Sequence, residues 1–278
     1  MAFQSICVVV TDKTSDAATL ASAAAIAARE NAHLDVYCLG IDVTRYEAMP
    51  IGAATVILDT AVEEARSQAA ALEKWVKTVL ANSDIKLSVE AVVAPQLGLD
   101  TLIGRLGRYA DLIVATKPYG AGRTPLHVNV VEAELLGTVA PVLVVPEGGC
   151  EEPFHRVAVG WNESSESYNA IRAALPVLRA ASKVDIVMVD PPTHSPERSD
   201  PGGSLGLMLA RHGVKAEVSI LSRTMPRVSE ILNRFATEHG CDLMVMGAYG
   251  HSRFREAILG GATRDLLEKS TVPLLMAH

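Results

Sequence analysis

The sequence predicts an α/β fold made of two repeated doubly wound domains, each a five-stranded parallel sheet flanked by helices. Short apolar, β-branched runs alternate with alanine- and leucine-rich helical stretches along the whole chain, which is the pattern of βαβ units. The apolar runs number five in each half. A chain of 278 residues is also long enough for two domains of ordinary size.

Each half offers five runs of strand length and composition. In the first half we expect strands near Ile6 to Val10, Leu34 to Leu39, Leu87 to Val93, Leu112 to Ala115 and Val142 to Val145. In the second half we expect them near Val157 to Val159, Val184 to Val189, Ala216 to Leu221, Leu243 to Met246 and Val272 to Met276.

Matched segments indicate that the two halves are a duplication. The pairs FQSICVVVTD and FHRVAVGWNE, ADLIVAT and CDLMVMG, and APVLVV and VPLLMA occur in the same order in both halves. Between the halves, VPEGGCEEP has the glycine, proline and acidic content of a linker. We therefore place the domain boundary near Gly149, with domains at 1–148 and 153–278.

Helices are expected between the strands. Ser164 is a candidate N-cap for a helix with an apolar face, and Thr14 to Asp16 hold the same place in the first half. Pro176 should kink or end the helix behind Ser164. The halves differ most after their second strands, where the first has a long helix at about 55–81 and the second a short one at about 205–212.

Composition excludes several classes of protein. A net charge of −7 argues against the broad basic face that nucleic-acid binding needs. No run reaches the roughly 18 apolar residues that span a bilayer, so no membrane partner is expected. The N-terminus lacks the pattern of a secretory signal, which predicts a cytoplasmic location. Four widely spaced cysteines form no CxxC pair and are expected to be buried reduced thiols.

A glycine-rich stretch follows the predicted strand that ends at Met246. In a doubly wound sheet, ligands bind beyond the carboxyl ends of the strands, where the winding direction changes. Gly247 and Gly250 would let the backbone approach a ligand closely or adopt positive φ. Gly260 and Gly261 precede the helical stretch ATRDLLEKS, and bare amides at a helix start bind anions.

The spacing of Gly247, Gly250 and Gly260 resembles the G-x2-G-x9-G-S/T signature of nucleotide-binding universal stress proteins, and the repeated halves resemble the tandem form of that family. The resemblance implies a sheet order of 3-2-1-4-5 in each half and a last strand that pairs across a dimer interface. It also implies that the last glycines and a hydroxyl hold phosphates, and that an Asp after the first strand helps to hold the nucleoside.

This chain departs from that signature in three places. Gly261 occupies the Ser/Thr position, although Thr263 offers a hydroxyl from the first helical turn. The loss of one neutral hydrogen bond should weaken binding roughly two- to tenfold. Asn162 takes the place of the Asp, keeping an acceptor without the charge. In the first half Asp12 is present, but the stretch from Thr116 lacks the glycine spacing, so we expect no phosphate binding there.

The resulting hypothesis is that the second half binds ATP, or AMP or ADP, with or without magnesium, and that the first half is a scaffold. Such a protein would sense or regulate a stress response. The candidate binding residues are Gly247, Gly250, His251, Ser252, Arg253, Gly260, Gly261, Thr263 and Asn162.

Catalytic and metal-binding residues are not expected. His127, His155 and His278 have no partners at metal-ligand spacing. The chain has neither a G-x-S-x-G elbow nor a GxxxxGKS/T loop. At most we expect a slow ATPase, which rests on analogy of fold alone.

Two questions, one of function and one of assembly, stay open at this point. The departures at Gly261 and Asn162 leave a second hypothesis, a scaffold of the same fold that binds a protein partner and no nucleotide. The apolar last strands APVLVV and TVPLLMAH would be exposed edges unless they are covered. We predict that they pair within one chain as a pseudo-dimer of the two halves, and leave a further homodimer open.

Overall fold

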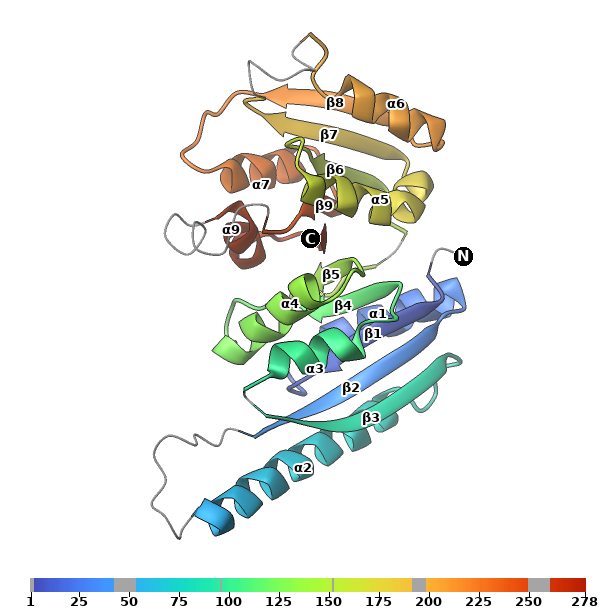
Figure 1. The fold of residues 1–278 in the computed structure, drawn as a ribbon. Coiled ribbons are helices and arrows are strands. Elements are labelled where there is room, and N and C mark those ends of the chain that lie inside the picture. Colours follow the sequence, from blue (N-terminus) through green and yellow to red (C-terminus); the bar gives the residue numbers. More distant parts are fainter. Residues whose placement is uncertain (1–2, 43–53, 96, 152, 192–198, 250–260) are drawn as a thin grey trace. The chain divides into compact units, whose positions relative to one another are not determined.

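The computed structural model describes residues 3–42, 54–95, 97–151, 153–191, 199–249 and 261–278, with the backbone alone at 54–59. Strands and helices alternate along both halves of the chain (Figure 1). The described chain divides into two compact units. The first holds Phe3–Thr116 and Ala121–Ala140, and the second holds Lys117–Gly120 and Pro141–His278.

The first unit contains four parallel strands in the order β3-β2-β1-β4. The strands are β1 (Ser5–Val10), β2 (His33–Asp42), β3 (Lys86–Pro95) and β4 (Leu112–Thr116). The helices are α1 (Ala17–Glu30), α2 (Ala54–Val79), α3 (Leu99–Leu106) and α4 (Pro125–Gly137).

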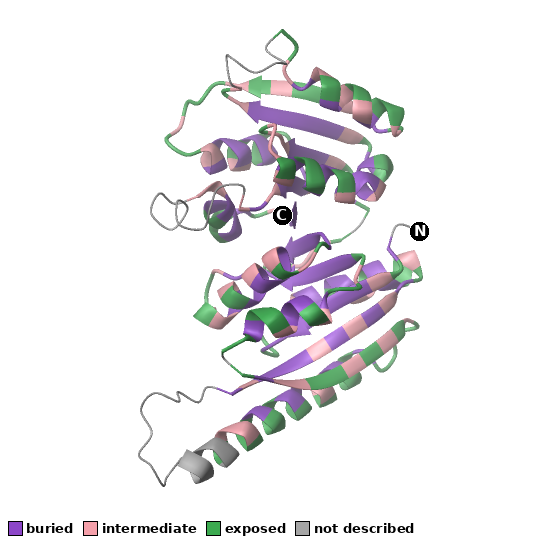
Figure 2. Cartoon of the chain, in the orientation of Figure 1, coloured by how far each residue is buried: buried purple, intermediate pink, exposed green. Residues whose placement is uncertain are grey.

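Helix α2 forms because its apolar residues recur every three or four positions. Ala65, Ala69, Leu72 and Val76 are all buried, and α2 packs through this face on β2 and β3. Strand β1 is buried almost throughout and lies between β2 and β4. The core therefore runs along β1 and β4, as the buried colour in Figure 2 shows.

The second unit contains strands β5 to β10 in the order β5-β10-β9-β6-β7-β8. All neighbours are parallel except β5 and β10, which are antiparallel, with Leu143 opposite Leu275. The strands are β5 (Val142–Val145), β6 (Arg156–Gly160), β7 (Lys183–Val189), β8 (Ala216–Leu221), β9 (Leu243–Gly247) and β10 (Leu274–Ala277). The helices are α5 (Ser165–Ala180), α6 (Gly203–Arg211), α7 (Val228–Glu238) and α9 (Ala262–Lys269).

The predicted fold class is confirmed, because each half contributes five strands in the order 3-2-1-4-5 of its own numbering. Strand β5 belongs to the first repeat in sequence but to the second unit by its contacts, since it pairs with β10. The domain boundaries drawn from the repeat, 1–148 and 153–278, stay a prediction. Among the described helices, none has the length and apolar character to cross a membrane.

Helix α5 begins at the predicted N-cap. The Ser164 Oγ accepts a hydrogen bond of 3.2 Å from the Ser167 backbone N–H. The helix continues through Pro176 to Ala180, so Pro176 does not end it, and the alternative expectation of a kink stays a prediction. Pro176 lies in the last two turns, where packing of the buried Ile171, Leu175 and Leu178 holds the helix against the sheet.

We predict that Ser164→Ala lowers the free energy of unfolding by about 0.5 to 2 kcal/mol, because it leaves an amide of the first turn without its acceptor. Ser164→Asp retains a capping oxygen and should stay close to the parent. Denaturant unfolding of the three proteins checks this. Equal stability of Ser164→Ala and the parent would contradict a capping role for the hydroxyl.

Candidate functional site

The described candidate residues gather at the carboxyl edge of the sheet in the second unit. Strands β6 and β9 are neighbours, with Val159 opposite Val245, and the chain winds away from them in opposite directions. Gly247 ends β9, and Asn162 follows β6 by two residues. This is the point of a doubly wound sheet where a ligand crevice forms.

Gly247 is required by a close approach between β9 and α5. A Cβ atom at this position would lie 2.5 Å from the Ser167 backbone nitrogen and 2.6 Å from the Glu166 carbonyl carbon. Backbone atoms cannot move aside as the end of a side chain can. The glycine therefore lets the end of β9 lie against the first turn of α5, a reason that the motif alone does not reveal.

Asn162 shapes the turn that leads into α5. Its Oδ1 accepts a hydrogen bond of 3.2 Å from the Ser164 N–H. In the first unit the Asp12 Oδ1 accepts bonds of 2.9 and 2.8 Å from the Thr14 and Ser15 N–H groups. The two residues thus hold equivalent places in the repeats. The bond from Ser15 in particular holds the Asp12 pKa below its usual value, whereas Asn162 supplies an acceptor that carries no charge.

Helix α9 begins without a side-chain cap. Gly261 is its N-cap residue, in an extended conformation with φ −64° and ψ 151°. Thr263 lies in the first turn, is only 3% exposed, and accepts a hydrogen bond of 3.2 Å at Oγ1 from the Tyr249 N–H. This hydrogen bond links Tyr249, two residues after β9, to the first turn of α9.

The structure thus brings Gly247 and Asn162 to the start of α5, and Gly261 and Thr263 to the start of α9. The other candidates are Gly250, His251, Ser252, Arg253 and Gly260, which lie outside the described residues. Their role stays a prediction from the spacing.

Charged residues surround the start of α9, and sequence reasoning overlooked several of them. Asp265 is buried, and its carboxylate accepts hydrogen bonds from Arg227 Nη1 and from Ser229 Oγ. Arg264 is exposed, and its guanidinium carbon lies 5.8 Å from the centre of the Tyr119 ring. The only sequence signal was the position of Arg264 three residues after Gly261, the last glycine of the motif.

In the first unit the structure brings together Ser15, His127 and Asp16, a set that the local sequence did not suggest. His127 Nε2 lies 3.2 Å from Ser15 Oγ, which donates a 3.0 Å bond to Asp16 Oδ1. His127 Nδ1 accepts a 3.1 Å bond from the Thr124 N–H, so in the neutral ring the proton is on Nε2. In this arrangement His127 therefore donates to Ser15 Oγ, and Ser15 donates to Asp16, so Ser15 is not hydrogen-bonded to a general base.

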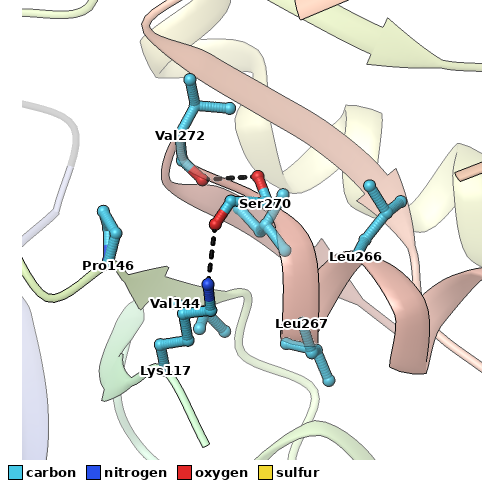
Figure 3. Close-up of a pocket in the computed structure, with 8 residues that line it drawn as sticks. Lys117, Val144, Pro146, Leu266, Leu267, Ser270 and Val272 are labelled. Carbon is cyan, nitrogen blue, oxygen red and sulfur yellow. Dashed lines mark hydrogen bonds between the residues drawn. The ribbon is translucent and has the colours of Figure 1, made fainter. Parts of the chain in front are cut away.

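A small hollow beside α9 is not a ligand site. It is lined by Lys117, Val144 and Pro146 on one side and by Leu266 and Ser270 on the other (Figure 3). Its side chains leave no volume in which a water molecule fits.

Metal binding has no support in the parts of the chain that the structure describes. Those parts contain no group of three or more His, Cys, Asp or Glu side chains placed to hold a metal ion.

Comparison with known proteins gives one family. A family model described as the universal stress protein family matches residues 153–278. Universal stress protein Slr1230 of Synechocystis sp. is 32% identical over 98 residues, which are 35% of this chain and 33% of that protein. The alignment therefore spans about a third of the length of that relative.

Two solved structures share the fold over nearly the whole chain. A universal stress protein from Archaeoglobus fulgidus is 14% identical with a TM-score of 0.67, covering 98% of this chain and 95% of that chain. A putative universal stress protein from Pseudomonas aeruginosa is also 14% identical, with a TM-score of 0.60 and coverage of 99% and 93%. At this identity the likeness concerns the fold alone.

Proposed function

Because residues 153–278 match the universal stress protein family, we propose that the second half of the chain binds ATP or a related adenine nucleotide and acts as a sensor or regulator in a stress response. The observation that carries the proposal is the spacing of Gly247, Gly250 and Gly260 directly after β9. Its first residue, Gly247, ends β9 beside β6, at the switch point where ligands of doubly wound folds bind.

The geometry of the described residues supports phosphate binding at the start of α9. No described side chain caps this helix, which favours its first amides as donors for an anion. A helix terminus contributes only about 0.3 to 1 kcal/mol, whereas micromolar affinity needs about 8 kcal/mol. Several amides, a cation and an adenine pocket must therefore act together.

We propose binding rather than rapid catalysis. The described candidates Gly247, Asn162, Gly261 and Thr263 include no general base. At the corresponding edge of the first unit, the described Ser15 and His127 lie side by side, but Ser15 Oγ donates its proton to Asp16 and not to His127. Any turnover of ATP should accordingly be slow.

A second candidate is a scaffold of the same fold that binds a protein partner and no nucleotide. It is favoured by Thr263 and Asn162, whose side-chain oxygens already accept backbone N–H groups of this chain. In that case the glycines would serve only the turn between β9 and α9.

Titration of ATP, ADP and AMP, with and without magnesium, into the purified protein tests the proposal by calorimetry. We expect Gly260→Val to weaken binding by about tenfold or more, because the valine side chain would keep the phosphate away from backbone N–H donors. Each hydrogen bond lost in this way lowers the affinity about two- to tenfold. Gly206→Val is the matched control, because a Cβ at Gly206 has no neighbour within 4 Å. A parent protein that ignores millimolar ATP would contradict nucleotide binding and favour the scaffold.

A further inference from the structure

A short segment of the first repeat, Lys117–Gly120, contacts both ends of helix α9. Its residues belong to the second compact unit, and the Lys117 N–H is bonded to the Val145 carbonyl at 3.0 Å. We call this segment the α9 clamp. It continues directly from β4 and ends four residues before Thr124, the N-cap residue of α4.

At the carboxyl end of α9 the clamp acts through Lys117. Lys117 Nζ donates a 2.9 Å hydrogen bond to the carbonyl of Ser270, the C-cap residue of the helix (Figure 3). The Ser270 hydroxyl donates a 2.9 Å bond to the Val272 carbonyl. A cation at this position is favoured by the negative end of the helix dipole and satisfies a carbonyl that the helix itself leaves free.

At the amino end the clamp acts through Tyr119. Arg264 lies in the first turn of α9, where the helix dipole disfavours a positive charge. Asp265, its neighbour, cannot neutralise it fully, because the two oxygens of that carboxylate accept bonds from Arg227 and Ser229. Among the described residues Arg264 forms no ion pair, and the face of the Tyr119 ring is the partner that favours its charge.

We infer that Arg264 is a further phosphate-binding residue of the second half and that Tyr119 is the residue that positions it, with the clamp holding α9 in place. This inference rests on the proposed nucleotide binding. A cation in the first turn is costly in the empty helix and becomes favourable when an anion lies beside it. The clamp would thus make the affinity of the site depend on a segment of the first repeat, and the effect should grow with the number of ligand phosphates.

Calorimetric titration of Tyr119→Leu, Tyr119→Phe and Arg264→Gln with ATP and with adenosine tests the inference. We expect Tyr119→Leu to weaken ATP binding about two- to fivefold and Arg264→Gln about tenfold, with adenosine affinity unchanged. Tyr119→Phe keeps the ring and should match the parent. The double variant Tyr119→Leu with Arg264→Gln should be no weaker than Arg264→Gln alone. ATP affinity that is unchanged in Tyr119→Leu would overturn the role of Tyr119.

Hydrogen exchange of the ligand-free protein separates this inference from the proposed function. Lys117→Met and Tyr119→Leu should each raise exchange of the α9 amides several-fold, whereas Gly206→Val should not. If the parent binds no nucleotide, the proposed function fails and the phosphate role of Arg264 falls with it. Unchanged exchange in both clamp variants would instead overturn the clamp, whatever the parent binds.

Discussion

Gly247→Ala should lose about 1 to 3 kcal/mol of unfolding free energy, the typical cost of forcing an extra carbon into a packed region. The new Cβ would lie 2.5 Å from the Ser167 nitrogen and 2.6 Å from the Glu166 carbonyl carbon. Both are backbone atoms in the first turn of α5, so β9 and α5 must separate. Because Asn162 and Ser164 shape that same turn, nucleotide affinity should fall together with stability.

Gly160→Ala is the matched control for Gly247→Ala. Gly160 ends the neighbouring strand β6, and its added Cβ would lie 3.6 Å from Met246 Cβ, an ordinary contact. The free energy of unfolding of this variant should lie within about 0.5 to 1 kcal/mol of the parent's, as is typical of a Gly→Ala change that the backbone tolerates. Denaturant unfolding measures both. Gly247→Ala with the stability of Gly160→Ala would contradict the close approach of β9 and α5.

Replacing Glu134 by leucine should stabilise the protein by about 1 to 3 kcal/mol at pH 8, because it removes a buried polar group that has no hydrogen-bond partner among the described residues. Glu134 lies in α4 and is 1% exposed, and in the described part of the chain neither of its carboxylate oxygens is hydrogen-bonded. Its burial, and next the charge of Asp16, raise the pKa of this carboxyl well above its usual value. At a pH between the pKa values of the unfolded and folded states, the folded protein therefore keeps a proton on Glu134 that the unfolded chain releases.

The sign of the pH dependence follows from that raised pKa. Protonated Glu134 contributes its full stability below the pKa that this carboxyl has in the unfolded chain, about 4.3. That contribution is lost as the pH rises through the higher pKa of Glu134 in the folded protein. The parent should thus lose stability between pH 5 and pH 8 relative to Glu134→Leu. Glu64→Leu, at an exposed position of α2, is the control. A gap between parent and Glu134→Leu that does not widen with pH would contradict a buried protonated carboxyl.

The sheet could be predicted from the sequence because each parallel strand is an apolar run between helical patterns. The ends of two interior strands differ from the expected ones. The second strand was expected at Leu34 to Leu39, but β2 continues to Asp42 because it pairs with β3 over ten residues. The last strand was expected from Val272, but β10 begins at Leu274, since the Val272 carbonyl bonds the Ser270 hydroxyl and Pro273 has no N–H to pair.

The candidate site could be predicted only in part. The motif indicated that Gly247 and Asn162 would meet at one edge, because the carboxyl ends of parallel strands share that edge. It could not show what a side chain at Gly247 would strike, since the atoms belong to α5, far away in sequence. The contact of Ser15 with His127, 112 positions apart, and that of Tyr119 with Arg264 depend likewise on packing that no local pattern records.

The measurement that tests nucleotide binding most directly is to denature freshly purified protein and quantify the released adenine nucleotide by chromatography and mass spectrometry. The account predicts close to one nucleotide per chain, retained in Gly206→Val and lost in Gly260→Val. Protein that releases none and also shows no thermal shift with millimolar ATP and magnesium would contradict it.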